Sequence, residues 1–193
     1  MQIDPTALPS PHAIEFLRGK LRSVPDFPKP GIIFKDITPL LDDAQALHVT
    51  LDLLAQPFID QRIRHVVAME ARGFIFGAAI AARLNAGFVP VRKPGKLPAA
   101  TDSVRYALEY GESELHMHQG ALAKDDRVLV VDDLLATGGT AKATGELIGK
   151  QGAVVVAFAF VVELDFLDGR KLLQNAPGNA PVIHSLIRVA AGE

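Results

Sequence analysis

The stretch that decides the fold is VLVVDDLLATGGT, which spans residues Val128–Thr140. An aliphatic run over Arg127–Val131 predicts a buried strand, and the acidic pair Asp132 and Asp133 follows it directly. A short loop with a glycine pair and two threonines then leads into a helix predicted over Ala141–Gln151. In open α/β sheets, ligands bind beyond the carboxyl ends of the strands. The stretch therefore predicts a ligand site at the end of this strand.

The loop after the acidic pair has the composition of a phosphate-binding loop. Gly138 and Gly139 let the backbone turn so that N–H groups converge on an anion, and the hydroxyls of Thr137 and Thr140 add donors. The start of the following helix contributes unsatisfied N–H groups and partial positive charge. Together with Ala136, these residues suit a phosphate monoester.

The acidic pair suits a different part of a ligand. Ionised Asp132 and Asp133 accept hydrogen bonds but donate none, so they favour sugar hydroxyls or a hard cation. A helix cap beside an incidental acidic pair is the alternative for a bare strand that ends in two Asp, and the full stretch weighs against it. The sequence contains neither a Walker-type loop nor the glycine spacing of a dinucleotide fingerprint.

Further strands and helices alternate on both sides of this stretch. Continuous apolar strands are typical of a parallel sheet covered on both faces, and strand–helix–strand order requires right-handed crossovers. The sequence predicts an α/β fold with an open, mostly parallel, Rossmann-like sheet flanked by helices. The additional strands are expected at Ile63–Met69, Gly87–Val91, Val154–Val162 and Val182–Val189, with a helix at Phe74–Asn85.

Two regions interrupt this alternation within one predicted domain, residues 1–193. The first, about residues 1–45, is a small N-terminal hood with helices expected at His12–Leu21 and Ala44–Ala55, the latter capped by Asp42 or Asp43. The second, about residues 92–118, begins as a flexible loop rich in Pro, Gly and basic residues. It continues as a β-hairpin over Val104–Glu109 and Glu114–His118.

Composition excludes several classes of protein. The net charge of -2 argues against a protein that coats nucleic acid, and the absence of cysteine excludes disulfides and thiolate chemistry. The longest apolar runs are about half of the roughly 20 residues that a membrane span needs. The first residues show no signal peptide, so we expect a cytoplasmic protein with neither membrane nor nucleic-acid partners.

The acidic pair and loop, Asp132–Thr140, resemble the phosphoribosyl-pyrophosphate (PRPP) signature of type I phosphoribosyltransferases, whose fold would account for the predicted sheet. The sequence LLATGGT, at residues 134–140, is similar to the corresponding sequence in the adenine branch of this family. Further segments agree with that branch: Phe27–Thr38, Glu70–Phe74, Arg92–Pro98 and Tyr106–Gly111. Lys35 departs from the family pattern, because the family commonly has Arg at this position. Lys keeps the positive charge but lacks the guanidinium group that binds an anion through two hydrogen bonds.

The resemblance implies a reaction in which adenine and PRPP give AMP and pyrophosphate, with Mg²⁺, in a homodimer of the purine salvage route. PRPP phosphate and ribose would bind at Asp132, Asp133 and residues Ala136, Thr137, Gly138, Gly139 and Thr140. Mg²⁺ would be held by Asp132 and Asp133, directly or indirectly. Pyrophosphate would bind at Glu70, Ala71, Arg72, Gly73, Lys93 and Lys96, with Arg92 reaching toward the neighbouring subunit. The loop that carries both lysines would close over PRPP and exclude water.

The resemblance also implies how the base is recognised. Phe34 would stack on adenine, the backbone of Ile33 would pair with its edge, and Leu134 and Leu164 would form apolar walls, with Lys35 nearby. Glu109 would act as the catalytic carboxylate that handles a proton of the base.

Two rival functions follow from the same motifs. One is a phosphoribosyltransferase for another base. The sequence LLA at residues 134–136 and the residues around Phe34 disfavour this function. The other is a non-catalytic PRPP-sensing regulator, which the small hood and the presence of Glu109 disfavour. His116 and His118 have no third ligand nearby in the sequence, so we expect no metal site there.

Overall fold

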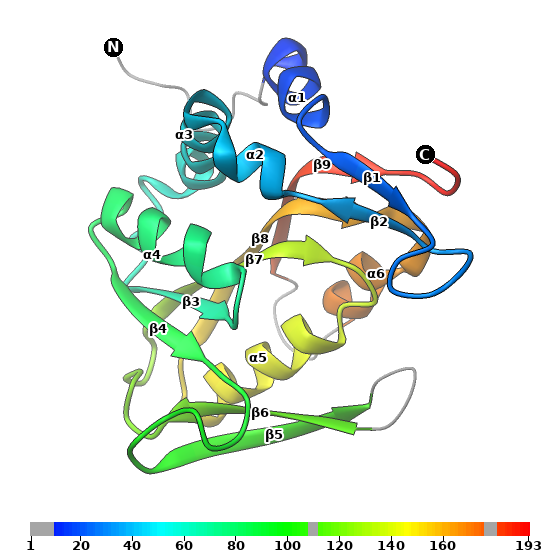
Figure 1. The fold of residues 1–193 in the computed structure, drawn as a ribbon. Coiled ribbons are helices and arrows are strands. Elements are labelled where there is room, and N and C mark those ends of the chain that lie inside the picture. Colours follow the sequence, from blue (N-terminus) through cyan, green and yellow to red (C-terminus); the bar gives the residue numbers. More distant parts are fainter. Residues whose placement is uncertain (1–9, 108–111, 176–180) are drawn as a thin grey trace.

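The computed structural model describes residues 10–107, 112–175 and 181–193. Its centre is a five-stranded parallel sheet in the order β4-β3-β7-β8-β9 (Figure 1). The predicted α/β class with an open parallel sheet is therefore confirmed. The strands are β3 (His65–Met69), β4 (Gly87–Val91), β7 (Arg127–Leu135), β8 (Val154–Leu164) and β9 (Val182–Val189).

Helices cover both faces of this sheet because its central strands are apolar on both sides. Val131 packs into a core with the first four helices, whereas its neighbour Val130 packs into a second core on the opposite face. The first group is α1 (Pro11–Arg18), α2 (Thr38–Asp42), α3 (Ala44–Ala55) and α4 (Gly73–Arg83). The second group is α5 (Gly139–Lys150) and α6 (Gly169–Gln174).

Helix α4 lies unusually close to the sheet. A Cβ atom on Gly77 would stand 2.6 Å from the Cβ atom of Ala68 in β3 and 3.0 Å from the ring of Phe88 in β4. The glycine is therefore required for this approach. The close packing sets where α4 begins relative to the end of β3.

The hood contains a two-stranded antiparallel ribbon, β1 (Arg22–Pro25) and β2 (Ile33–Asp36). The sequence predicts only turns here, because Pro and Gly dominate residues 25–31 and each strand has just four residues. Asp36 anchors the ribbon: it accepts bonds from Thr38 N at 2.9 Å and from Arg22 NH2 at 2.5 Å. These hydrogen bonds lower the pKa of Asp36 to about 2.

The hood helices differ slightly from prediction. Helix α1 ends at Arg18, three residues before the expected end. Asp43 is the cap of α3, since its Oδ1 accepts from Ala46 N at 2.9 Å. Short 3-10 turns follow α3 and β8, at Gln56–Phe58 and Asp165–Leu167.

A β-hairpin of β5 (Thr101–Ala107) and β6 (Glu112–His118) lies along α5 (Figure 1). Its apolar residues Val104, Leu115 and Met117 join the second core. The hairpin starts three residues earlier than predicted on its first strand. No helix in the described part of the chain is long and apolar enough to cross a membrane.

Candidate active site

Strand β7 carries the acidic pair within the sheet and not beyond it. The strand was predicted to end at Val131, but its pairing with β8 continues through Asp132 and Leu135. Helix α5 likewise begins at Gly139, two residues earlier than predicted, because Gly138 takes φ +82° and turns the chain directly into the helix. That left-handed conformation is the one glycine adopts without steric cost.

The phosphate loop, residues 136–140, surrounds a small cavity of about 90 Å³. All five loop residues predicted to bind phosphate line it, together with Asp132 and Leu134. The cavity opens at the N-terminus of α5, whose first N–H groups have no partner within the helix. The arrangement fits one anionic group held by backbone N–H groups and hydroxyls.

The two carboxylates of the pair lie in different surroundings. Asp133 is buried and accepts from Arg72 Nε, while Asp132 Oδ1 accepts from the backbone N of Asp133 at 2.9 Å. Burial, together with the negative charge of Asp133, raises the pKa of Asp132 well above its usual range. Without a further positive charge nearby, the protonated, neutral form of Asp132 is therefore favoured.

A second loop, residues 70–73, joins β3 to α4 beside the acidic pair. A Cβ atom on Gly73 would stand 2.8 Å from Asp132 Oδ1, so the second loop lies directly against the acidic pair. Arg72 connects three predicted regions: it pairs with Asp133, and its guanidinium carbon lies 5.8 Å from the centre of the Phe34 ring. Residues predicted to hold pyrophosphate, ribose and base thus meet around Arg72.

The basic residues after β4 are divided between paired and exposed positions. Arg92 Nε donates to Glu70 Oε2 at 2.8 Å, and its NH1 donates to the carbonyl of Lys96 at 3.2 Å. The side chains of Lys93 and Lys96 are exposed to solvent beside the second loop. Arg92 was expected to reach a neighbouring subunit, and within this chain it binds the carboxylate of the second loop.

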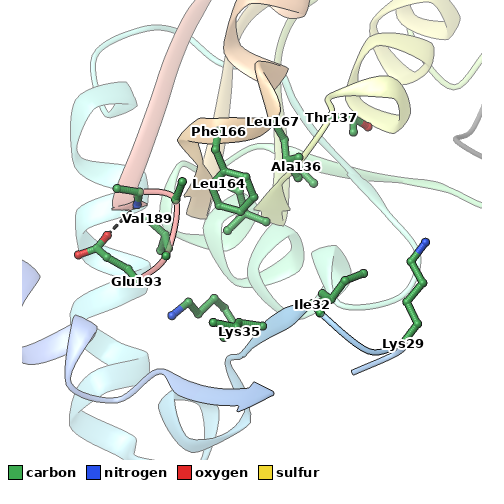
Figure 2. A pocket seen from close by; sticks show the side chains of 15 residues that line it. Lys29, Ile32, Lys35, Ala136, Thr137, Leu164, Phe166, Leu167, Val189 and Glu193 are labelled. Atoms are coloured by element: carbon green, nitrogen blue, oxygen red, sulfur yellow. Dashed lines mark hydrogen bonds between the residues drawn. The ribbon is translucent and has the colours of Figure 1, made fainter. Parts of the chain in front are cut away.

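A large cavity of about 870 Å³ lies between the hood and the end of the sheet. Figure 2 shows Ile32 and Lys35 of the hood across this space from Leu164, Phe166 and Leu167. Of the five residues predicted to bind adenine, Ile33, Lys35 and Leu164 line it, as do Ala136 and Thr137 of the phosphate loop.

Phe34 and Leu134 are not part of the lining of this large cavity. Successive side chains of a strand point to opposite faces, so Phe34 lies on the other face of β2 from Ile33 and Lys35. There its ring packs against Phe27, with centroids 5.1 Å apart, and beside Arg72. Lys35 Nζ donates to Ser23 Oγ at 2.9 Å, which holds it along the ribbon.

Several residues at the site were not predicted as ligands. Tyr106 of the hairpin lies 3.2 Å, hydroxyl to hydroxyl, from Thr140 of the phosphate loop. The C-terminal residues 189–193 close one side of the large cavity (Figure 2). No sequence pattern marked either contact. The predicted catalytic residue Glu109 lies outside the described residues.

Comparison with known proteins agrees with this geometry. The phosphoribosyl transferase domain family matches residues 39–175, so the fold and the loops are those of a phosphoribosyltransferase. The adenine phosphoribosyltransferase of Sorangium cellulosum is 65% identical over 187 residues, covering 97% of this chain and 94% of that protein. The chain belongs to the adenine phosphoribosyltransferase family, which confirms the predicted family and enzyme class.

Solved structures lead to the same family. The crystal structure of adenine phosphoribosyltransferase from Thermoanaerobacter pseudethanolicus is similar with a TM-score of 0.86 and 49% identity, covering 91% of this chain and 99% of that one. The enzyme from Saccharomyces cerevisiae, crystallised with adenine and an imino-altritol bisphosphate, has a TM-score of 0.83 and 37% identity. It covers 91% of this chain and 98% of the yeast chain.

Proposed function

We propose that this chain transfers the 5-phosphoribosyl group of PRPP to adenine, giving AMP and pyrophosphate in purine salvage. The observation that carries the proposal is the meeting of two anion-binding loops at one acidic pair, where Gly73 touches Asp132 and Arg72 binds Asp133. PRPP has an anionic group at each end of a ribose, which is the pattern that such a site would hold.

Each part of PRPP then has its own place. The 5′-phosphate binds at Ala136, Thr137, Gly138, Gly139 and Thr140, while Asp132 and Asp133 accept from the ribose hydroxyls. Pyrophosphate binds at Glu70, Ala71, Arg72 and Gly73, with Arg92, Lys93 and Lys96 above it. The two loops start from adjacent parallel strands, so both ends of PRPP are held on one rigid frame.

Mg²⁺ fits the donor set at the acidic pair. Asp132 and Asp133 offer oxygen ligands, and Mg²⁺ is usually bound by one or two carboxylates plus substrate phosphates. Among the described residues no group of three metal-ligating side chains exists, which suits an ion that arrives with PRPP. When bound, Mg²⁺ supplies positive charge next to the diphosphate.

The chain's own residues favour separation of charge at the anomeric carbon. Breaking the C1′–O bond leaves positive character on the ribose and negative charge on pyrophosphate. Arg72 stabilises the departing diphosphate, and the carboxylates of Asp132 and Asp133 face the sugar that becomes positive. Because both ends are fixed, the ribose is held in line between the leaving group and the base.

Adenine lies beside strand β2 of the hood in this proposal. The backbone of Ile33 pairs with the edge of the base, Phe34 stacks on it, and Leu134 and Leu164 form apolar walls; stacking alone contributes roughly 1–3 kcal/mol. Lys35 lines the adjoining cavity. Glu109 handles a proton of the base as the glycosidic bond forms.

A homodimer and a cytoplasmic location belong to the same proposal, and both rest on family membership. Neither a nucleic acid nor a membrane is expected as a partner. Light scattering of the purified chain tests the dimer, and a mass equal to one chain at all concentrations would refute it.

The substrate assay tests the central claim. Purified protein is incubated with PRPP and Mg²⁺ and, in separate reactions, with adenine, hypoxanthine, guanine, xanthine or orotate. We expect AMP from adenine and no nucleotide from the other bases. Nucleotide from another base but none from adenine would refute the proposal, and PRPP binding without any product would favour a PRPP sensor. Asp132→Asn and Asp133→Asn should weaken PRPP or Mg²⁺ binding.

A further inference from the structure

An ion pair between Arg170 of α6 and the buried Glu163 of β8 lies near the phosphate loop. Glu163, at the end of β8, is 2% exposed and is paired in the sheet with Leu135, the residue before the loop. Arg170 Nε donates to Glu163 Oε1 at 2.7 Å, and NH2 donates to Oε2 at 2.5 Å. Its third nitrogen, NH1, donates to the carbonyl of Ile183 at 3.1 Å. All three guanidinium nitrogens of Arg170 therefore donate hydrogen bonds, and these bonds join α6 to β8 and β9.

The carboxylate of this pair is held in its charged form. Burial opposes ionisation of Glu163, but hydrogen bonds from Arg170, with the charges of Arg170 and Arg188, lower its pKa below the usual value. Among the described residues, Glu163 and Asp133 are the two least exposed carboxylates, and they lie in the neighbouring strands β8 and β7. A buried charge is costly unless it is paired with good geometry and its remaining hydrogen-bonding groups are satisfied.

The residue next to Arg170 packs directly on the phosphate loop. A Cβ atom on Gly169 would overlap the carbonyl oxygen of Ala136 and stand 3.1 Å from the backbone N of Gly138. Reciprocally, a Cβ atom on Gly138 would stand 2.9 Å from the carbonyl oxygen of Gly169. The two backbones are in contact with no side chain between them, so a shift of α6 displaces the loop.

The turn from the loop into α5 is not stabilised by a side-chain cap. Gly138 is the cap of α5 and makes no side-chain hydrogen bond there, in contrast to the capped starts of α1 and α3. The backbone of Gly169 supplies the missing support from behind. The position of Gly169 is in turn fixed by the salt bridge of Arg170 and by the buried side chain of Leu173.

We propose that Arg170, through its ion pair with Glu163, is a positioning residue that holds Gly169 against the phosphate loop and so sets the geometry in which the 5′-phosphate is bound. Arg170 itself touches no ligand in this proposal. The inference rests on the proposed function, because it assumes that residues 136–140 bind the 5′-phosphate of PRPP and AMP. It predicts that disturbing α6 affects ligands that carry a 5′-phosphate and spares pyrophosphate.

Kinetics of the reverse reaction, AMP plus pyrophosphate, separate these two ligands. We expect Gly169→Ala to raise KM for AMP, and KM for PRPP in the forward direction, by about tenfold or more, with KM for pyrophosphate changed by less than about twofold. Arg170→Lys keeps the positive charge but loses the paired N–H donors of the guanidinium group. We therefore expect KM for AMP and for PRPP to rise by about threefold or more, again with little change in KM for pyrophosphate. The matched control is Gly149→Ala in α5, where a Cβ atom meets nothing within 4 Å and all constants should stay as in the wild type.

The possible results distinguish the positioning role of Arg170 from the proposed function. Equal rises in KM for AMP and pyrophosphate, or a Gly169→Ala enzyme that behaves like Gly149→Ala, would overturn the positioning role. If Gly169→Ala does not fold, Arg170→Lys decides, and an unchanged KM for AMP in that variant overturns the proposal. Failure of both variants to fold would also overturn it, because the pair would then serve overall stability. A wild type that makes no AMP would instead refute the proposed function.

Discussion

Replacing Arg72 with methionine removes the only cation that the structure places on Asp133 within the described residues. The methionine retains much of the apolar stem of the side chain, so the change isolates the guanidinium group. Asp133 stays where it is, near the carboxyl end of strand β7, with 8% of its side chain exposed. A buried carboxylate is then left without its charged partner.

The magnitude follows from the burial of the two partners. A hydrogen bond to a charged group contributes about 1.5–3 kcal/mol, and breaking a fully buried ion pair costs roughly 3–5 kcal/mol. Because the side chain of Arg72 is 47% exposed, the lower range applies. We expect the free energy of unfolding to fall by about 2 kcal/mol, which is a decrease in Tm of roughly 4–8 °C for a chain of this length.

The assay is urea denaturation at pH 7 without ligands, with Asp133→Asn and the double variant measured alongside. The double variant should be more stable than the sum of the single changes predicts, by about 1–2 kcal/mol, because the unpaired charge is gone. Arg83→Met is the matched control. It breaks a pair with Asp52, whose side chain is 57% exposed, and such surface pairs contribute only about 0–1 kcal/mol.

Two outcomes would refute this reasoning. Arg72→Met could cost no more than Arg83→Met, which would mean that water compensates Asp133 despite its burial. Strict additivity in the double variant would mean that the two residues do not interact in solution. Either result would also remove the argument that Arg72 couples the second loop to the acidic pair.

Three further predictions concern packing, pH and catalysis. Gly77→Ala should lower the free energy of unfolding by about 1–3 kcal/mol, because its Cβ atom would collide with Ala68, whereas the open site of Gly149→Ala should show no loss in the same denaturation experiment. Burial lowers the pKa of His184 below 6.5, so unfolding takes up a proton and the wild type should lose stability as pH falls below about 6.5. His184→Gln should flatten that dependence, and an unchanged slope would contradict the prediction. Glu109→Ala should lower kcat by about tenfold or more with little change in PRPP affinity, and unchanged turnover in steady-state assays would exclude Glu109 from the mechanism.

The sheet could be predicted because its strands are continuous apolar runs, which are typical of a parallel sheet covered on both faces. Val128–Val131 and the glycines that follow carry both the strand and the loop in their residue types. The hood ribbon could not be predicted in this way. Its four-residue strands are too short for periodicity, and the Pro and Gly residues around them are equally typical of turns.

The contacts that organise the site were less accessible from sequence than its residues. Arg72 and Asp133 were each predicted as ligand-binding residues, but 61 positions separate them and nothing local indicates that they pair. The position of Glu163 does indicate an ion pair, because a carboxylate at the end of an apolar strand needs a charged or hydrogen-bonding partner when it is buried. Its partner Arg170 becomes apparent only when α6 is folded back onto β8.

The hood ribbon and the main sheet are separate hydrogen-bonded units within the described residues, since β1 and β2 pair only with each other. In the proposed complex, the side of the site that selects the base is carried mainly by the ribbon, and the side that holds the sugar phosphate is carried by the sheet. Substitutions in a few ribbon positions could then change the preferred nucleobase without altering the strand ladder beneath the phosphates. Because of this division, the base specificity can change during evolution through the ribbon, while the part of the sheet that holds the sugar phosphate stays the same.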